Sequence, residues 1–224
     1  MVPPPLRGTR RKGFRANVDG DSMTVQRMHG PVSERRIRAS LLRILARTQL
    51  CSIATVADEK QAHINTAFIA YSTNLEFYFL SDPESQHCRN LASNPSLAMT
   101  IFDSSQRWEN PGVGVQLFGV GRRAVGRQAD LARKVYGTRF PAFERWIESQ
   151  TSQGDRRAAR LKSYAFFRFL PDRVKILDEA EFGGAVFIVA KIERTRASAG
   201  SHRTSLRWLK TEVLLPESSR RRRT

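Results

Sequence analysis

Apolar residues recur every three to four positions in one early segment and then gather in short β-prone runs along most of the remaining chain. In the early segment, Ser33 and Glu34 supply a helix N-cap and an acidic first turn. The apolar positions that follow keep a helical period: Ile37, Leu41, Leu42, Ile44 and Leu45. This pattern predicts a helix over residues 33–47.

The β-prone runs are joined by short polar turns, which is typical of a meander. Strands are expected at 50–57, 61–71, 75–81, 96–103, 113–125, 163–170, 173–177 and 184–192. Pro171-Asp172 is interpreted as the turn between two of them, and Gly119 and Gly121 predict a bulge or a close backbone approach. Helical patterns occur at 83–91, at 127–137 and from Pro141 onwards. We therefore predict a mainly β protein with flanking helices (α+β), built on an antiparallel β-barrel of six to eight strands.

Charge divides the chain into three parts. The 224 residues carry 38 Lys and Arg against 21 Asp and Glu, a net charge of +17. Residues 1–47 account for +8 of it, residues 191–224 for +7, and the centre for only +2. We predict a basic mobile arm at 1–32, a barrel domain at 33–192 and a basic, disordered tail at 193–224. The tail residues able to dock on an apolar patch are Trp208, Leu209, Val213 and Leu214.

Several protein classes are excluded by what the sequence lacks. No apolar run approaches the ~20 residues of a membrane span, and no apolar stretch follows the basic N-terminus as in a secretory signal. Cys51 and Cys88 are too few for a disulfide framework or a four-ligand zinc site. We expect a cytoplasmic protein with no membrane partner and no metal site. The motifs of serine hydrolases, zinc proteases and nucleotide-binding loops do not occur.

The segment 81–94 carries the most chemistry. Ser81, Ser85, Gln86 and His87 place hydroxyl, amide and imidazole groups near a helix N-terminus. Backbone N–H groups there favour an anion, and phosphate is the anion expected to bind. The alternative is that Ser81 and Ser85 only cap the helix.

The two cysteines have different surroundings. Cys51 falls in an apolar strand and is expected to be a buried small hydrophobe. Cys88 follows His87 and precedes Arg89, and a positive neighbour lowers a thiol pKa. Without an adjacent base and a group that orients it, this is a weak case for a nucleophile.

The order of segments resembles a known family. The strands HINTAFIAY and EFYFLS, the segment SQHCRNLASNP, the strands LAMTIFD and VQLFGVGRRAV, and the run ADLARKVYGTRFPAF occur in that order. This set resembles the FMN-binding split barrel of the pyridoxamine 5'-phosphate oxidase-like superfamily, and within it a branch of small bacterial proteins without assigned substrates. The similarity covers about residues 36–190 and leaves out both basic ends.

The resemblance implies roles for particular residues. One strand lays its backbone along the isoalloxazine ring, the segment after the next strand holds the phosphate, and a glutamine on a later strand contacts the flavin. The cofactor-binding residues implied are Asn65, Thr66, Ala67, Phe68, Ser81, Ser85, Gln86, His87 and Gln116. No residue is implied as a catalytic acid or base.

The sequence departs from the family pattern mainly at the phosphate. An arginine is common in the family's oxidases where Asn65 stands, and a lysine where Ala70 stands. Two further cations are replaced by Gln86 and His87, and Arg89 is the nearest residue able to compensate. Leu177 stands where the family has a tryptophan near the flavin. The Arg–x–His motif that binds pyridoxal phosphate is not recognisable, so the small-molecule substrate stays open.

The function expected from the resemblance is an FMN-dependent oxidoreductase, active as a homodimer with the flavin at the interface. One alternative is a non-catalytic stress or regulatory protein that binds flavin, haem or F420. Another is a nucleic-acid-associated protein that makes weak electrostatic contacts through its basic ends, which include four arginines at 220–223. Four aromatic residues either line a substrate pocket or cover the end of the barrel: Trp108, Phe140, Phe143 and Trp146.

Overall fold

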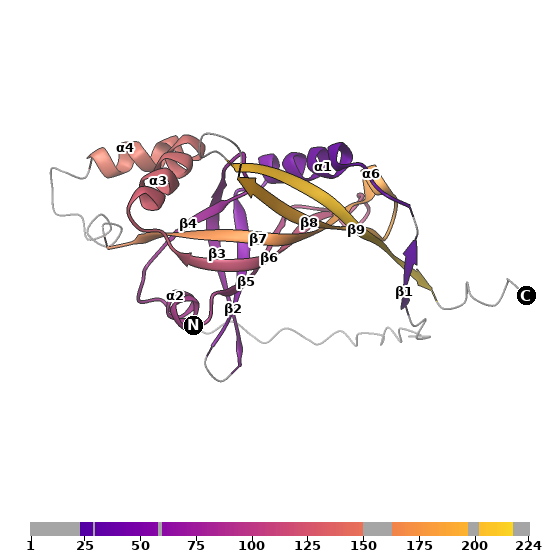
Figure 1. Ribbon diagram of the computed structural model, residues 1–224, viewed down its shortest axis with the longest axis horizontal. Helices are drawn as coiled ribbons and strands as arrows, with labels where there is room; N and C mark the ends of the chain where they lie inside the picture. The colour runs from indigo at the N-terminus through magenta and orange to yellow at the C-terminus, as the bar shows by residue number, and fades with distance from the viewer. Residues whose placement is uncertain (1–22, 29, 58–59, 150–162, 197–201, 217–224) are drawn as a thin grey trace, which may run out of the picture.

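The computed structural model describes residues 23–28, 30–57, 60–149, 163–196 and 202–216, and Figure 1 labels its elements. Six antiparallel strands close into a barrel in the order β7-β4-β3-β2-β5-β6, with β6 pairing back onto β7. They are β2 (Leu50–Val56), β3 (Ala62–Tyr71), β4 (Phe77–Ser81), β5 (Ser96–Phe102), β6 (Val113–Arg123) and β7 (Ala165–Asp178). Closure pairs each of these strands on both sides over at least part of its length, and β3 pairs with β4 over only three residues. The mainly β, antiparallel barrel predicted from the sequence is confirmed.

Strand β7 runs through Pro171 without a break, so the predicted turn at Pro171-Asp172 is wrong. One edge of β7 pairs with β6, while on the other edge residues 165–169 pair with β4 and residues 173–177 pair with β8 (Val186–Arg196). Pro171 lies in the gap between these two ladders, and its carbonyl accepts a hydrogen bond from Arg194 Nη1 at 2.8 Å. A missing N–H there costs no ladder hydrogen bond, which is why proline is tolerated inside a strand.

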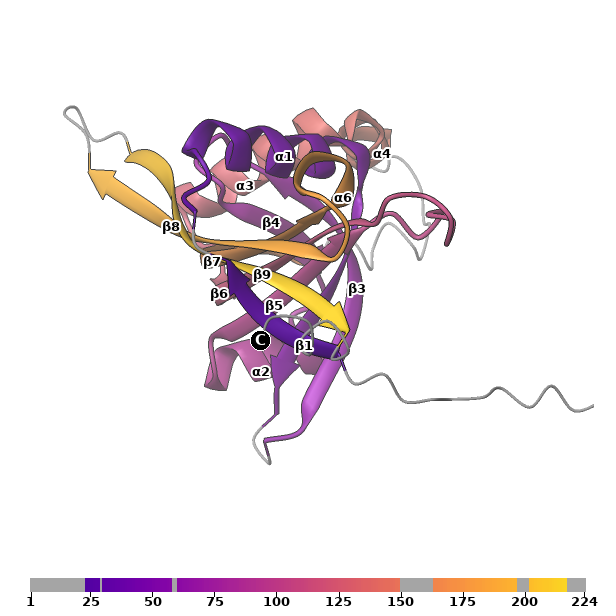
Figure 2. The ribbon, with the colours of Figure 1, turned by 90° about the vertical axis from the view of Figure 1, so that its right-hand side faces the viewer.

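Three strands extend the sheet beyond β7, in the order β8, β9 (His202–Pro216) and β1 (Met23–Met28). Figures 1 and 2 show β8 and β9 leaving the barrel as a ribbon, with β1 along the outer edge of β9. The prediction of a mobile arm and a disordered tail is therefore wrong for residues 23–28 and 202–216. Thr204, Leu206 and Val213 of β9 are buried. Residues 1–22 and 217–224 lie outside the described residues.

Helix α1 (Glu34–Arg47) begins where the sequence predicts it, and Ser33 Oγ accepts a hydrogen bond from the backbone N–H of Arg36. Its predicted apolar face is buried, apart from Leu42, which is 37% exposed. The other helices are α2 (Gln86–Ser93), α3 (Arg127–Arg139), α4 (Pro141–Ser149) and the short α6 (Glu179–Phe182). Figure 1 shows α1, α3 and α4 above the barrel and α2 below it. None of the described helices is both long and apolar enough to cross a membrane.

The glycines of β6 allow close backbone packing, as predicted. The β6–β7 register shifts between Phe118 and Gly119, which marks a bulge. A Cβ on Gly119 would lie 2.2 Å from the carbonyl oxygen of Leu170, and one on Gly121 would lie 2.6 Å from Leu97 Cδ1. Gly119 therefore fits where no side chain can.

The barrel is filled by one apolar core that extends under α1. Phe77, Phe79 and Phe169 are fully buried in it, and Cys51 is 3% exposed, as expected of a buried small hydrophobe. A smaller cluster on the outer side of β4 joins Tyr78 to Ala124 and Ala132, and it fixes α3 against the barrel. Helix α3 is thereby held over the ends of β3 and β4, where the two cavities described below are found.

Candidate functional site

Strands β3 and β4 diverge, and this divergence opens the candidate site. They pair only through Ile69, Ala70 and Tyr71, so among the strands that the structure describes, residues 62–68 of β3 pair with β2 alone. The N–H of Ile69 donates to Gln49 on the β2 side. Backbone groups alternate along a strand, so those of Thr66 and Phe68 point to the opposite, unpaired edge. A ligand with its own donors and acceptors can bind along this edge.

A cavity of about 530 Å³ lies between the open edge of β3, the end of β4 and the start of α2. Seven of the nine predicted cofactor residues line it: Asn65, Thr66, Ala67, Phe68, Ser81, Ser85 and His87. The structure adds five that the sequence analysis missed, namely Leu80, Asp82, Glu84, Tyr136 and Tyr164. Three of these lie within or beside the predicted segment, whereas the tyrosines come from α3 and from just before β7. The volume of the cavity suits a small-molecule or cofactor site.

His87 organises the polar end of this cavity. Its Nε2 lies 2.8 Å from Ser81 Oγ, 3.3 Å from Ser85 Oγ and 3.4 Å from Asn65 Nδ2. The ring is parallel to that of His63, with centroids 6.2 Å apart. Burial lowers the pKa of His87, and the neighbouring His63 lowers it further. At neutral pH His87 is therefore an uncharged hydrogen-bonding group.

The start of α2 offers backbone donors to the same end of the cavity. Gln86 and His87 are the first helical residues, and N–H groups at that position have no acceptor within the helix. Ser85 occupies the N-cap position, but its hydroxyl donates to the carbonyl of Asp82 at 2.6 Å and makes no side-chain cap. Ser81 bonds to His87 instead. The alternative that Ser81 and Ser85 only cap the helix is therefore wrong.

Two of the nine predicted cofactor residues, Gln86 and Gln116, lie outside the cavity. The side chain of Gln86 runs along α2, where it donates to Asn90 Oδ1 at 2.7 Å and accepts from Arg89 Nη2 at 3.0 Å. Arg89 also donates to the carbonyl of Glu84 and does not line the cavity. The expectation that Arg89 compensates for the missing cations is thus not met within this chain.

Gln116 lies on the outward face of the sheet, in a separate apolar hollow of about 220 Å³. The strand registers place Thr66, Ser52, Thr100 and Gln116 in one row across β3, β2, β5 and β6. Strands are about 4.8 Å apart, so Thr66 and Gln116 are roughly 14 Å apart. Gln116 of the same chain is thus three strands away from a ring that lies along Thr66.

Charge at the cavity is negative. Among the described residues that line it, Asp82 and Glu84 carry carboxylates and none is a lysine or arginine. Asp82 Oδ1 accepts the backbone N–H of Glu84 at 3.0 Å, which turns this carboxylate toward the start of α2. The open β3 edge and the two tyrosines fit a planar flavin ring. The phosphate end provides neutral donors beside two carboxylates, so this chain's described residues fit the ring better than the phosphate.

The cysteines provide no nucleophile. Burial raises the pKa of Cys88, and this effect is larger than the lowering by hydrogen bonds from Ser85 and Ser81. The lowered pKa inferred from the residues next to Cys88 in the sequence is therefore wrong. Burial also raises the pKa of Cys51, to about 12. Both thiols stay protonated at neutral pH.

The aromatic residues considered for a substrate pocket separate in space. Phe140 and Phe143 pack on Tyr136, with ring centroids 4.7 and 5.2 Å apart, and Phe140 also meets Phe68 at 5.7 Å. They support the cavity wall at the end of the barrel and do not line it. Trp108 is fully exposed. The side chain of Trp146 lies outside the described residues.

Comparison with known proteins agrees with this fold. A family model described as pyridoxamine 5'-phosphate oxidase matches residues 37–178. No curated protein matches the chain. A conserved hypothetical protein from Mycobacterium tuberculosis is 15% identical, with a TM-score of 0.51 over 70% of this chain and 92% of that one.

Two further solved structures have lower TM-scores. A heme binding protein from Mycobacterium smegmatis is 17% identical, with a TM-score of 0.49 over 80% of this chain and 60% of that one. The heme storage protein HutZ from Vibrio cholerae is 17% identical, with a TM-score of 0.47 over 61% of this chain and 90% of that one. At such identities a structural likeness speaks for the fold alone.

Proposed function

The chain belongs to the pyridoxamine 5'-phosphate oxidase family, and from this premise we propose that it is an FMN-binding flavoprotein that oxidises or reduces a small molecule. The observation that carries the proposal is the unpaired edge of β3 facing a cavity at the start of α2. A flavin ring carries donors and acceptors along one side, which is what an unpaired strand edge complements. When bound, the flavin supplies the hydride chemistry, and the protein supplies binding, orientation and electrostatics.

The residues have distinct tasks in this proposal. The backbone of Thr66 and Phe68 binds the ring edge. Tyr136 forms part of the wall, and burial raises its pKa to about 12, so its hydroxyl stays protonated. Ser81 and the first N–H groups of α2 hold the phosphate through neutral hydrogen bonds, and the Ser85 hydroxyl joins them by turning from the Asp82 carbonyl to the phosphate. His87 is uncharged and positions the two serine hydroxyls.

A homodimer completes the site. The outward face of the barrel sheet exposes several large apolar side chains, with Ile64 70%, Phe68 52% and Phe102 46% exposed. Exposed apolar faces of this kind mark interaction surfaces. Gln116 lies on the same face, and its distance from Thr66 means that it serves the flavin of a second copy.

The first test is a visible absorption spectrum of the purified protein, with mass identification of any released ligand. A flavin spectrum with FMN released supports the proposal. A colourless protein that also fails to take up added FMN overturns it. Ser85→Ala is expected to weaken FMN binding about tenfold, because a hydrogen bond to a charged group is lost. Ser96→Ala, an exposed serine outside the cavity, is the matched control and is expected to bind FMN normally.

The homodimer is tested by light scattering on the eluting protein. Ile64→Lys places a charge on the apolar face and is expected to give monomers with weakened FMN binding. Gln116→Ala is expected to weaken FMN binding while leaving the dimer intact. A wild-type monomer that binds FMN would refute the role given to Gln116.

A second candidate is a non-catalytic protein that binds a flavin or a related ligand on the same barrel. The two carboxylates and the neutral His87 at the phosphate end favour it, because they bind FMN less tightly than cations would. Turnover of NADPH with an electron acceptor distinguishes the two: steady turnover supports the oxidoreductase, and tight binding without turnover supports the second candidate.

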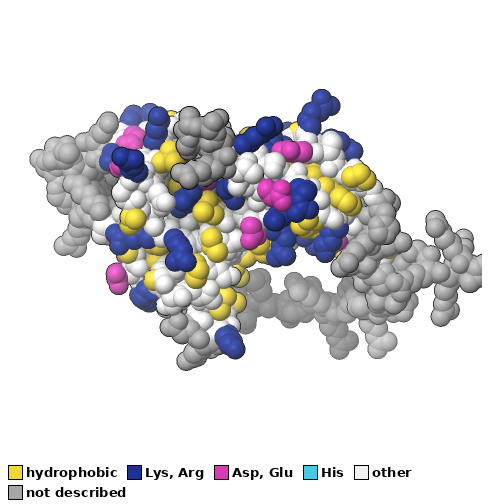
Figure 3. Space-filling view, viewed as in Figure 1, with side chains coloured by type: hydrophobic (Ala, Val, Ile, Leu, Met, Phe, Trp, Pro, Cys, Tyr) yellow, Lys and Arg dark blue, Asp and Glu magenta, His cyan; other side chains and the backbone are white. Residues whose placement is uncertain are grey.

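The nucleic-acid alternative has less support in the described residues. Figure 3 shows Lys and Arg side chains spread over one face of the molecule and interspersed with other types. They do not gather there into one continuous basic stripe, which is the usual electrostatic footprint of such proteins. The four arginines at 220–223 lie outside the described residues, so their contact with a polyanion stays a prediction.

A further inference from the structure

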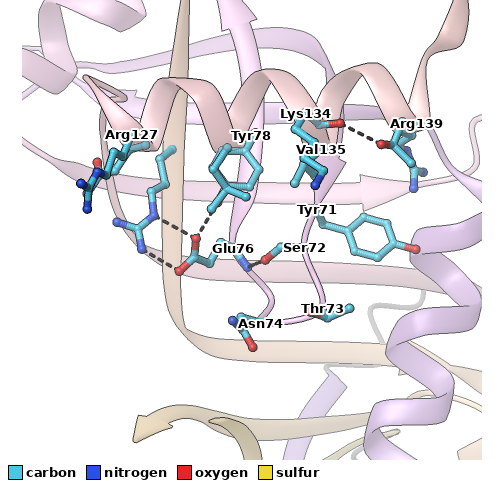
Figure 4. Close-up of a pocket in the computed structure, with 14 residues that line it drawn as sticks. Tyr71, Ser72, Thr73, Asn74, Glu76, Tyr78, Arg127, Lys134, Val135 and Arg139 are labelled. Atoms are coloured by element: carbon cyan, nitrogen blue, oxygen red, sulfur yellow. Dashed lines mark hydrogen bonds and ion pairs between the residues drawn. The ribbon is translucent and has the colours of Figure 1, made fainter. Parts of the chain in front are cut away.

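A second, larger cavity of about 1050 Å³ lies between α3 and the turn that joins β3 to β4 (Figure 4). The turn supplies Ser72, Thr73 and Asn74, and α3 supplies the opposite wall. Arg168 of β7 and Glu76, which precedes β4, complete it. This cavity shares no lining residue with the candidate flavin cavity, although α3 borders both.

Glu76 carries the one carboxylate among the described residues that line this cavity, and it is already paired. Glu76 is 6% exposed and accepts from Arg168 Nη2 at 2.6 Å, from Arg168 Nε at 3.1 Å and from the hydroxyl of Tyr78 at 2.5 Å. Figure 4 shows Glu76 and Tyr78 below α3. The pair contributes no net charge, so the remaining lining residues set the sign of the cavity.

The part of the lining that the structure describes holds three further cations, and all of them lie on α3. No salt bridge between described residues involves Arg127, Lys134 or Arg139. Arg139 is held in place: its Nη2 donates to the carbonyls of Leu45 and Thr48, each at 2.7 Å, and its guanidinium lies 4.8 Å from the ring centroid of Tyr71. These contacts fix its position without neutralising its charge.

The helical spacing arranges the free cations along the cavity. Arg127 and Lys134 are seven residues apart, which is two turns and about 10.5 Å along the helix. Leu131 lies between them on the same face and is 45% exposed. Across the cavity the turn offers hydroxyl and amide groups. An apolar strip between two cations, opposite neutral donors, matches a molecule with acidic groups on an apolar body.

We propose that this cavity is a binding site for a small anion that carries phosphate or carboxylate groups, held by Arg127 and Lys134. The proposal does not depend on the flavin proposal, since the two cavities share no residue. It also gives the chain two sites of opposite charge, a negative cavity at α2 and a positive one at α3.

The test is calorimetric titration of the full chain at physiological salt with suberate, which carries two carboxylates on an apolar chain, and, separately, with pyrophosphate, which has no apolar body. Saturable binding of either probe is expected for the wild type. Arg127→Gln with Lys134→Gln is expected to weaken it about tenfold or more. The matched control, Arg35→Gln with Arg107→Gln, removes two exposed cations elsewhere and is expected to bind like the wild type. Leu131→Glu keeps both cations and is expected to weaken binding by repulsion.

The same variants separate the possible failures. If neither probe binds the wild type at millimolar concentration, the proposal is wrong. If both double variants weaken binding equally, the attraction comes from the overall charge of +17 and there is no site here. A far-UV circular dichroism spectrum and a urea midpoint equal to those of the wild type show that the Arg127→Gln, Lys134→Gln variant is folded, so a loss of anion binding cannot be attributed to unfolding, whether or not the chain binds FMN.

Discussion

Replacing Glu76 with glutamine tests whether the buried ion pair behind the β3–β4 turn is needed for stability. Glu76 is 6% exposed and receives three hydrogen bonds, two from Arg168 and one from Tyr78. Glutamine keeps the shape but loses the charge and turns an amide N–H₂ toward these donors. Arg168 is then left partly buried without the Glu76 carboxylate. The neighbouring Arg194 also loses that carboxylate; burial lowers the pKa of Arg194, and the charge of Glu76 raises it.

The magnitude follows from this geometry. Removing one partner of a buried pair costs about 3–5 kcal/mol because the other charge is left unpaired. The side chain of Arg168 is 23% exposed, so water partly replaces the lost carboxylate. We therefore expect the lower end, a decrease of about 3 kcal/mol in the free energy of unfolding. Tyr78→Phe removes one hydrogen bond only and is expected to cost about 1 kcal/mol.

The pH dependence gives an independent check. Burial by itself raises the pKa of Glu76, but the hydrogen bonds from Arg168 and Tyr78 outweigh it, and the net pKa lies below its ordinary value of 4.5. A lowered pKa stabilises the folded state above pH 4.5, and this stabilisation is lost as the pH falls through the folded-state pKa. The difference between wild type and Glu76→Gln should therefore shrink in acid.

The assay is urea unfolding followed by circular dichroism at pH 7 and at pH 3.5. Glu193→Gln is the control, because Glu193 pairs with Arg207 at the exposed surface and such pairs contribute little. Equal midpoints for Glu76→Gln and Glu193→Gln at pH 7 would refute the reasoning. So would a difference from wild type that is as large at pH 3.5 as at pH 7.

Three further predictions concern the barrel, the thiols and the flavin cavity. Gly119→Ala is expected to lower the free energy of unfolding by about 3 kcal/mol, because the new Cβ meets the Leu170 carbonyl. In Gly114→Ala, on the same strand, the new Cβ meets nothing closer than 3.6 Å, so this variant should be tolerated. The urea midpoints of the two variants compare their stabilities. Both cysteines are buried, and burial raises the pKa of Cys51 to about 12. A chromogenic disulfide reagent should therefore label neither thiol in the folded protein at pH 8, and should label both after unfolding. Rapid labelling of the folded protein would contradict this. Asp82→Asn with Glu84→Gln is expected to tighten FMN about tenfold and leave riboflavin unchanged, since only FMN carries the repelled phosphate. Fluorescence titration measures both ligands, and an equal effect on them would show that the carboxylates do not face the phosphate.

Local sequence patterns were sufficient for elements whose stabilising contacts lie within or next to them. The helix at 34–47 follows from its cap and its apolar period, and most barrel strands follow from short apolar runs between turns. The cavity residues on β3 and at 81–87 belong to two continuous segments, so the resemblance could assign them together. The β9 strand carried a weaker signal, in which Thr204, Leu206 and Trp208 alternate with the polar residues Arg203, Ser205 and Arg207. The high charge of the segment masked this signal.

The features that were wrong or missed depend on partners far away in the chain. Pro171 stands inside a strand because of the gap between β4 and β8 on one edge of β7, which no local pattern records. The ladder of β1 with β9 joins residues about 190 positions apart. Arg89 was the nearest arginine in sequence, yet it extends along α2 and does not line the cavity.

By itself, then, the sequence determined most of the helices and strands, the barrel class, the family, and the two segments that meet at the candidate flavin cavity. Only the tertiary structure decided the pairing of β9 with β8 and β1, the three strand spacings that separate Gln116 from Thr66, and the opposite charges of the two cavities. Periodicity and capping are local and can be read along the chain. Strand pairing and the charge of a cavity are set by residues that folding brings together from distant positions, and these can be known only once the chain is folded.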